Sequence, residues 1–257
     1  MQKTASSIDA QDIDRFDRLS EKWWDMNGPM RPLHQFTPVR IDYILRSARR
    51  AGLIRNHIDS EKPLQGLNIL DIGCGGGLLA EPLSQLGGRL TAIDASSGAI
   101  RAAKAHAKTQ DLEIDYLQTS AEELSASPSY KAAFDIVYAS EVIEHVTDRD
   151  IFIAAVAQLL KPDGLVVLTT INKSLPALFT AKIAAEYILG LIPRGTHQFS
   201  QFVRPQTLQA EFARQNILLD DVTGFVPTLT GGFRMSGLTA VNYGICGQFF
   251  EHRSAKE

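Results

Sequence analysis

Three side chains with acid–base chemistry lie close together near the middle of the chain, namely Glu141, Glu144 and His145. Their spacings of three and four residues would place all of them on one face of a helix. Two carboxylates and an imidazole can hold a divalent ion such as Mg2+, although Mg2+ prefers oxygen ligands. His145 could instead act as a general base supported by Glu144. The third interpretation is an ordinary first helical turn without chemistry.

A glycine-rich loop with an acid before it is the second chemical feature. The short apolar run 67–72 contains Asp71, and four of the next five residues are glycines, beginning with Gly73 and Gly75. The run is too short for a helix and predicts a buried parallel strand. Glycines at the carboxyl end of such a strand let the backbone turn sharply and approach a ligand closely. The pattern predicts the first half of a nucleotide-binding βαβ unit.

The next predicted strand, 89–94, ends in an acid, Asp94, which lies 21 positions after Gly73. In a doubly wound sheet, a carboxylate at about this spacing accepts the ribose hydroxyls of a nucleoside. The glycine spacing fits the dinucleotide pattern poorly. The pattern Asp-x-Gly-x-Gly-x-Gly at 71–77 instead resembles the first motif of class I S-adenosylmethionine-dependent methyltransferases. The resemblance implies S-adenosylmethionine as cofactor, with Asp71 and Gly75 beside its methionine part and Asp94 on its ribose.

The remainder of the chain alternates predicted helices and strands. Helices are expected over 78–86, 99–109, 151–160 and 207–215, and strands over 113–118, 134–139, 165–171, 218–224 and 240–246. The alternation predicts right-handed crossovers and a parallel sheet. The expected fold is therefore α/β and Rossmann-like. It has a mostly parallel seven-stranded sheet, helices on both faces, and a terminal antiparallel hairpin joined by a flexible connection at 231–237.

The amino-terminal region predicts two helices. Apolar residues recur at helical spacing over 12–24, and a second helix is expected from a cap at Thr37, with Pro38 as its first residue, to about residue 51. We expect residues 1–55 to cap the cofactor site, and residues 56–257 to form a class I methyltransferase domain with an apolar insertion at 174–197.

The amino-terminal region also carries a more specific resemblance, which extends over about residues 13–250. It is similar to the signature of the ubiquinone-biosynthesis O-methyltransferases at Phe16, Trp23, Trp24, Asp25, Asn27, Gly28, Pro32, Leu33, His34, Pro38, Arg40, Asp42, Tyr43 and Ile44. The resemblance implies methylation of phenolic hydroxyls on polyprenylated catechol-type intermediates and on demethylubiquinol. Two alternatives stay open: a methyltransferase of another small lipid-like acceptor, and a non-catalytic scaffold of a biosynthetic complex.

The resemblance implies roles for individual cofactor-binding residues. Arg40 would contact the methionyl carboxylate, and a guanidinium suits a carboxylate chemically. Ser140 matches a family position that contacts the cofactor. The segment 120–124 lies where the loop of this fold meets adenine, so Ala121 and Glu122 are candidates; for Glu122 a solvated helix start is a close alternative.

The resemblance also bears on catalysis, because the activity of the family is linked to divalent metal. It implies that Glu141, Glu144 and His145 bind Mg2+ or another divalent ion. A phenol with a pKa of about 10 gains from conversion to phenolate at neutral pH. A metal would lower that pKa, whereas His145 as a base would remove the proton. His197 is a second candidate base.

The segment 175–192 is strongly apolar but is interrupted by a proline, a glycine and two charges. It is too interrupted to span a bilayer. It could cover the active site as a lid, or it could lie in a membrane surface with Lys173, Lys182 and Arg194 near anionic headgroups. A polyprenylated substrate suits the second interpretation, and one segment could do both. Peripheral contact with anionic lipid through 174–194 is therefore expected.

The composition argues against nucleic acid as a partner. The 257 residues carry a net charge of −3, with a pI of about 6.1, so no basic field favours nucleic acid. The two cysteines, Cys74 and Cys246, lack metal-site spacing and make no disulfide framework. The first 13 residues show no signal or transit pattern. We expect a cytoplasmic protein, peripheral on the inner face of the membrane, and a polyprenylated phenol or quinol as its partner.

Overall fold

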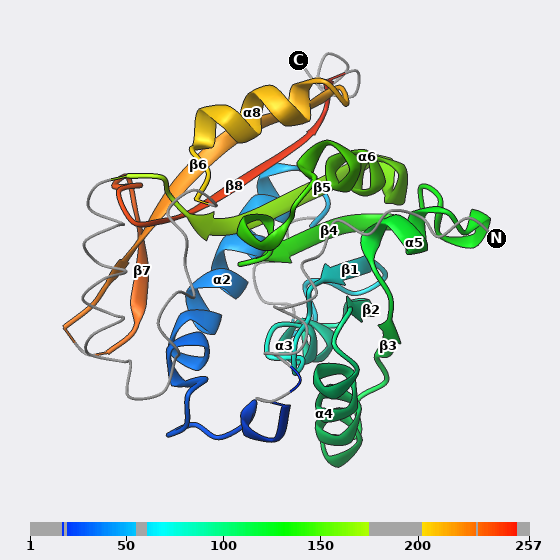
Figure 1. Ribbon diagram of the computed structural model, residues 1–257, viewed down its shortest axis with the longest axis vertical. Helices are drawn as coiled ribbons and strands as arrows, with labels where there is room; N and C mark the ends of the chain where they lie inside the picture. The colour runs from blue at the N-terminus through cyan, green and yellow to red at the C-terminus, as the bar shows by residue number, and fades with distance from the viewer. Residues whose placement is uncertain (1–16, 18–19, 55–60, 175–201, 230, 251–257) are drawn as a thin grey trace.

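The computed structural model describes residues 17, 20–54, 61–174, 202–229 and 231–250. Eight strands form one sheet in the order β3-β2-β1-β4-β5-β8-β6-β7 (Figure 1). Their bounds are β1 Asn68–Ile72, β2 Arg89–Asp94, β3 Asp115–Gln118, β4 Phe134–Ser140, β5 Leu160–Ile171, β6 Ile217–Pro227, β7 Phe233–Ser236 and β8 Asn242–Phe249. The first five strands pair in parallel, and β8, β6 and β7 pair antiparallel. The Rossmann-like architecture is thus confirmed.

Helices cover both faces of this sheet. The helical segments are η1 Ser20–Lys22, α2 Arg31–Arg50, α3 Ala80–Gln85, α4 Ser97–Thr109, α5 Ala121–Ser125, η2 Pro128–Tyr130, η3 Ile143–His145, α6 Arg149–Leu159 and α8 Pro205–Ala213, where η denotes a 3-10 turn. One core contains side chains of α5, α6 and α8, and the opposite face packs against α2, α3 and α4. Alternate residues of β4 enter opposite cores, as period-two geometry requires: Val137 lies with α6 and Tyr138 with α2.

The sheet has one strand more than the seven predicted. The additional strand, β7, lies within 231–237, where a flexible connection was expected. Its four residues are flanked by glycines and carry no strand signal of their own. Phe233 packs against Phe36 of α2 with ring centroids 4.8 Å apart, and β7 pairs with β6. Tertiary contact therefore creates a strand that local sequence does not specify.

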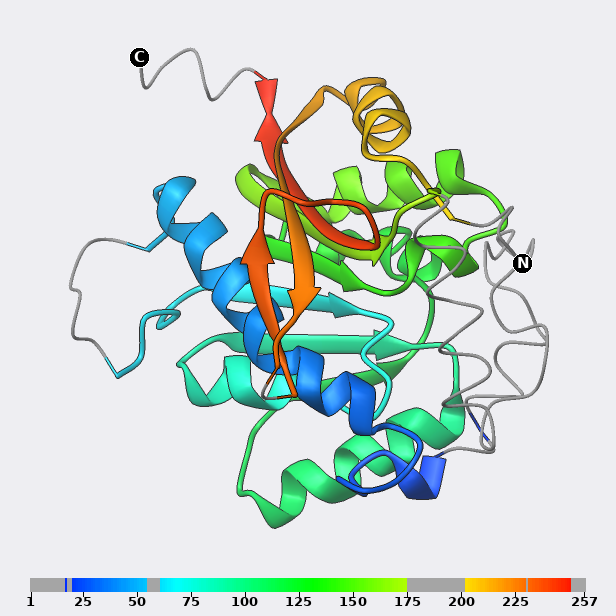
Figure 2. The same ribbon diagram turned by 90° about the vertical axis from the view of Figure 1, so that its left-hand side faces the viewer.

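Helix α2 begins at Arg31, so the prediction of a start at Thr37 and Pro38 is wrong. Pro32 in the first turn is the proline that starts the helix, and Pro38 is interior. An interior proline costs about 3 kcal/mol. Packing outweighs this cost, because each large apolar side chain that α2 buries contributes roughly 1.5–3 kcal/mol. Figure 2 shows α2 lying across one face of the sheet beside β7.

Other boundaries also differ from expectation. Strand β5 begins at Leu160, five residues before the expected start at residue 165, and its pairing with β4 is irregular. Of the predicted helix 12–24, the structure describes residues 17 and 20–24, where η1 is a single 3-10 turn. The insertion 174–197, apart from Ser174, lies outside the described residues.

The described residues on either side of that insertion are in contact. Asn172 and Val203 form an isolated parallel bridge, and the Tyr243 hydroxyl donates to the Val203 carbonyl at 3.0 Å. The chain therefore leaves and re-enters the sheet at one place. In the part of the chain that the structure describes, no helix is both long and apolar enough to cross a membrane.

Candidate functional site

The candidate site lies at the carboxyl ends of β1, β2, β4 and β5. Strand β1 pairs with β2 on one side and with β4 on the other, so the strand order reverses here. In open α/β sheets the crevice at such a switch point binds ligands. Asp71, Asp94 and Ser140 lie at or near these strand ends, as their spacing predicts.

The glycine loop after β1 requires glycine on conformational and steric grounds. Gly73 and Gly75 have φ values of +70° and +53°. A Cβ on Gly73 would lie 2.5 Å from the Val142 side chain, and a Cβ on Gly75 would overlap the Trp23 ring. The Gly73 amide donates to the Ile93 carbonyl at 2.8 Å, so the loop folds over the end of β2.

Asp94 joins the glycine loop to the start of α4. Its Oδ2 accepts from the Gly75 amide at 2.9 Å, and its Oδ1 accepts from the Ser96 amide at 2.8 Å. Burial raises the pKa of the Asp94 carboxyl, and these backbone donors only partly oppose that effect. The amide of Thr119 donates to the Asp94 carbonyl, which brings Ala121, at the start of α5, to the same edge of the sheet.

Arg40 reaches the crevice from α2 and is 4% exposed. Its Nη1 donates to Ser140 Oγ at 2.8 Å, and its Nη2 donates to the Leu33 carbonyl and to Thr37 Oγ1. Its buried Nε has no hydrogen-bond partner among the described residues. Burial lowers the pKa of Arg40, while the Glu141 and Asp71 carboxyls oppose this change. Thus α2 and β4, although far apart in sequence, place Arg40 and Ser140 in direct contact.

Asp71 is the buried acid of the same region, with an exposed fraction of 2%. Its Oδ2 has no hydrogen-bond partner among the described residues. Burial raises the pKa of Asp71 to about 7; nearby Tyr138 and Arg40 lower it and Asp94 raises it further. A buried carboxyl without a full set of partners favours its neutral form. A cation beside this oxygen would reverse that preference.

Glu141 does not share a helical face with Glu144 and His145, and that prediction is wrong. Glu141 leaves β4 with φ +56°, and only Ile143–His145 form a 3-10 turn. Positive φ is uncommon outside glycine, so spacing alone could not reveal it.

Hydroxyls of β4 and β5 connect Glu141 to Arg40. Thr169 Oγ1 donates to Glu141 Oε1 at 3.0 Å, and Ser140 Oγ lies 2.8 Å from Thr169 Oγ1. Each hydroxyl has one proton, so with Glu141 ionised the donor order runs from Arg40 through Ser140 and Thr169 to Glu141. This network links the guanidinium to the carboxylate without a direct ion pair.

Glu144 is buried, with an exposed fraction of 3%. Its Oε2 accepts from Thr170 Oγ1 at 2.8 Å. Burial raises the pKa of Glu144 to about 8, and the nearby Glu141 carboxyl adds to the effect. Glu144 is therefore mainly protonated at neutral pH. Burial also raises the pKa of the Glu141 carboxyl, and nearby Arg40 and the half-buried His145 oppose that effect.

The described part of the chain contains no group of three or more His, Cys, Asp or Glu side chains arranged to hold a metal ion. Glu141 and Glu144 accept from different threonines, Thr169 and Thr170. As folded here, the residues do not form a metal-ligand set. The metal site at Glu141, Glu144 and His145 stays a prediction. The second candidate base, His197, lies outside the described residues.

Sequence reasoning missed two groups of residues. Thr169 and Thr170 follow the apolar run 165–168 near the carboxyl end of β5, and polar residues at that end of a buried parallel strand are the signal that could have revealed them. Trp23 and Trp24 were expected to belong to the region that caps the cofactor site but were given no individual role, and both contact the glycine loop.

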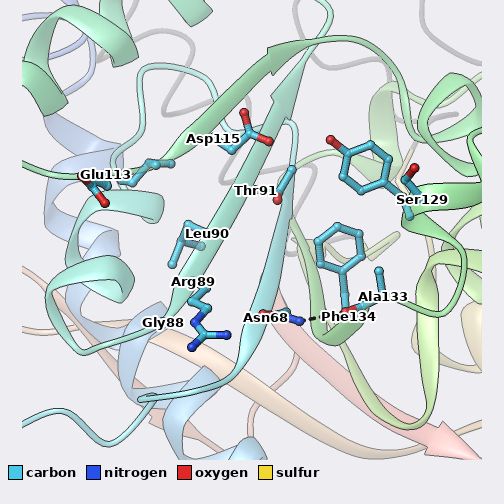
Figure 3. Close-up of a pocket in the computed structure, with 12 residues that line it drawn as sticks. Asn68, Gly88, Arg89, Leu90, Thr91, Glu113, Asp115, Ser129, Ala133 and Phe134 are labelled. Carbon is cyan, nitrogen blue, oxygen red and sulfur yellow. Dashed lines mark hydrogen bonds between the residues drawn. The ribbon is translucent and has the colours of Figure 1, made fainter.

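A separate surface pocket of about 570 Å3 lies elsewhere (Figure 3). It is lined by the first residues of four strands, Asn68, Arg89, Asp115 and Phe134. These residues mark the amino ends of β1 to β4, whereas the candidate site is at the carboxyl ends. The pocket is therefore not part of the candidate site.

Comparison with known proteins gives related sequences and related folds. Residues 70–168 match a family model described as a methyltransferase domain. Proteins named ubiquinone biosynthesis O-methyltransferase are 44% identical to the chain: that of Methylocella silvestris over 243 residues (93% of each chain) and that of Brucella ovis over 225 residues (87% of this chain and 89% of the relative).

Two solved structures have a similar fold. Magnesium protoporphyrin IX methyltransferase from Synechocystis, with bound SAH, has a TM-score of 0.62 at 18% identity, and the match covers 93% of this chain and 94% of that one. A SAM-dependent methyltransferase from Thermotoga maritima has a TM-score of 0.57 at 14% identity, covering 92% and 97%. At these identities the likeness concerns the fold alone.

Proposed function

The chain belongs to the family of ubiquinone biosynthesis O-methyltransferases, and we propose that it methylates phenolic hydroxyls of polyprenylated ubiquinone precursors. The acceptors would be a polyprenylated catechol-type intermediate and demethylubiquinol. The cofactor is S-adenosylmethionine, as the methyltransferase-domain match indicates.

The observation that carries this proposal is a pair of buried, incompletely bonded groups of opposite charge in the crevice. Arg40 Nε and Asp71 Oδ2 lack hydrogen-bond partners among the described residues. An unpartnered buried donor or acceptor costs about 1–3 kcal/mol. The methionyl end of S-adenosylmethionine has a carboxylate and an ammonium, which match these two groups in charge. The residues present therefore fit the cofactor: Arg40 and Asp71 would hold its amino-acid end and Asp94 its ribose.

When bound, S-adenosylmethionine supplies an electrophilic methyl group on a sulfonium. The chain then has to orient the acceptor oxygen, exclude water and manage the phenolic proton. A phenol has a pKa of about 10, so a base increases the phenolate fraction at neutral pH.

We assign the phenolic proton to His145. Its ring is half-buried and close to Glu141, whose carboxylate, when ionised against the effect of burial, would stabilise the imidazolium that forms. Glu144 is a poorer candidate, because its buried carboxyl is already mainly protonated and is bonded to Thr170. His197, in the part that the structure does not describe, is the second candidate.

Contact with anionic lipid through 174–194 is part of the proposal. A polyprenyl tail partitions into a bilayer, and this segment combines apolar residues with Lys182 and Arg194, with Lys173 immediately before it. An assembly with other enzymes of ubiquinone biosynthesis would serve the same purpose, because it would pass on an insoluble intermediate.

An acceptor series tests the proposal. Turnover with S-adenosylmethionine would be measured for demethylubiquinol analogues with zero, one and two isoprene units, with and without vesicles containing anionic phospholipid. We expect kcat/KM to rise with tail length and vesicle binding to require anionic lipid. Equal kcat/KM for all tails would favour a small soluble acceptor. Cofactor binding without turnover on any acceptor would favour the scaffold.

A further inference from the structure

Trp23 and Trp24 are the two tryptophans of the chain, and both lie against the glycine loop. The Trp23 ring is 6% exposed and occupies the space where Gly75 and Gly76 would otherwise have side chains. Trp24 Nε1 donates to the Gly76 carbonyl at 3.0 Å. One tryptophan thus packs on the loop, and its neighbour is hydrogen-bonded to the loop backbone.

Three other elements hold the Trp24 indole in place. It stacks on His106 of α4, with ring centroids 3.4 Å apart and an interplanar angle of 6°. His106 Nδ1 lies 2.8 Å from the buried Glu81 carboxyl of α3. His34 of α2 meets the indole edge-on and uses its Nε2 to bond the Trp23 carbonyl at 2.8 Å. The donor that reaches Gly76 is therefore fixed in direction.

The same amino-terminal segment also reaches the other side of the crevice. Asp17 accepts from the Gly98 amide at 2.7 Å and from Ser96 Oγ. The Ser96 amide in turn donates to Asp94. The segment therefore contacts both elements that meet at the candidate ribose acid.

We propose that Trp24 is a positioning residue of the cofactor site, which acts with Trp23 by holding the glycine loop in its ligand-binding conformation. The loop needs this support because Gly73, Gly75 and Gly77 all have positive φ, and glycines lose the most conformational freedom when they are fixed. The Gly76 carbonyl points to Trp24, while the Gly77 amide donates to the Cys74 carbonyl at 2.9 Å. Holding one peptide plane thus orients the next turn of the loop.

The expected consequence is preorganisation. A loop that is already ordered costs less to fix on binding, so cofactor affinity rises without any contact between tryptophan and cofactor. A side chain that only docked the segment would change stability and leave the affinity of the folded protein unchanged. The inference rests on the cofactor binding proposed above.

The test is Trp24→Phe, which retains an aromatic ring for stacking on His106 and removes the N–H donor. Met26→Ala is the control, because Met26 lies in the same segment and is 62% exposed. Affinity for S-adenosylhomocysteine would be measured by calorimetry, alongside Tm, acceptor KM and kcat at saturating cofactor. A hydrogen bond contributes roughly 0.5–1.5 kcal/mol, so Kd should rise about 2- to 12-fold. The acceptor KM and kcat should stay at wild-type values, and Met26→Ala should match the wild type throughout.

A Kd of Trp24→Phe equal to that of the wild type would overturn the role of Trp24. Absence of binding by the wild type would instead refute the proposed function. A second measurement does not depend on a variant. Because linkage is reciprocal, bound S-adenosylhomocysteine must stabilise the segment 20–28, which contains both tryptophans. Amide exchange over 20–28 should slow on binding by more than exchange in β6 and β7. Equal slowing in both regions would contradict the proposal even if Trp24→Phe failed to fold.

Discussion

Asp71→Asn is expected to stabilise the protein while weakening cofactor binding, and the stabilisation should grow as pH rises. Asp71 is 2% exposed, and its Oδ2 lacks a hydrogen-bond partner among the described residues. Burial is the main reason that its pKa rises from 3.8 to about 7. Asparagine has nearly the same shape but cannot ionise. The substitution therefore removes the cost of a buried charge together with the charge that would hold the cofactor ammonium.

The direction in which the stability difference changes with pH follows from proton binding by Asp71. The folded protein holds the Asp71 proton more tightly than the unfolded chain does, so the stability due to this group is fully present below pH 3.8 and is lost as pH rises through about 7. The interval between these two pKa values corresponds to about 4 kcal/mol, since one pKa unit equals about 1.4 kcal/mol. Asp71→Asn cannot ionise at this position and therefore does not lose this stability. Its advantage over the wild type should therefore grow by up to about 4 kcal/mol between acidic pH and pH 8.

The assay is urea denaturation of wild type and Asp71→Asn at intervals from pH 4.5 to 8, with S-adenosylhomocysteine affinity measured at each pH. Asp115→Asn is a suitable control, because Asp115 belongs to the same sheet but is exposed. A stability difference that stays constant with pH would refute the reasoning about burial. Undiminished cofactor affinity at pH 8 would refute the role of the Asp71 charge.

Three further substitutions separate the roles assigned in the crevice. Arg40→Lys should raise the cofactor Kd at least about tenfold in calorimetry and leave acceptor KM unchanged, since an ammonium cannot reproduce the fork of donors that guanidinium offers. Glu144→Gln should retain most of kcat at pH 7, because burial already keeps this carboxyl mainly neutral. If the variant instead loses kcat, and if Mg2+ restores the activity of chelator-treated wild type, the metal prediction is supported. His145→Ala should lower kcat by about 100- to 10,000-fold at unchanged cofactor Kd, the usual contribution of a general base, and a normal kcat would transfer that role to His197.

The sequence predicted the half of the fold that carries strong local signals. Strands β1, β2 and β4 are apolar runs bounded by glycine or acid, and their bounds agree closely with expectation. Strand β7 could not be predicted, because it depends on Phe233 meeting Phe36 from a distant helix. The start of α2 was misplaced for a related reason, because burial of one helix face decides whether Pro38 is tolerated inside it.

In the candidate site, too, residues with local sequence signals were predictable, whereas contacts between distant elements were not. Asp71, Gly73 and Asp94 are recognisable because their roles depend on spacing within one βαβ unit. The contact between Arg40 and Ser140 joins α2 to β4 and becomes visible only in the fold.

The hydroxyl network around Glu141 depends on strand register. Ser140 of β4 pairs with Thr169 of β5, and a shift of one residue would turn Thr169 to the other face of the sheet. No local pattern encodes that register, so the hydrogen-bond partners of the two threonines could not be assigned in advance.

Product analysis tests the central claim most directly. Wild type and Asp94→Ala would be incubated with methyl-labelled S-adenosylmethionine and a short-tailed demethylubiquinol, and the product would be identified by mass spectrometry and NMR. We predict label on the phenolic oxygen with the wild type and none with Asp94→Ala. Label on carbon, or no transfer by wild type that binds the cofactor, would contradict the assignment as an O-methyltransferase of ubiquinone precursors.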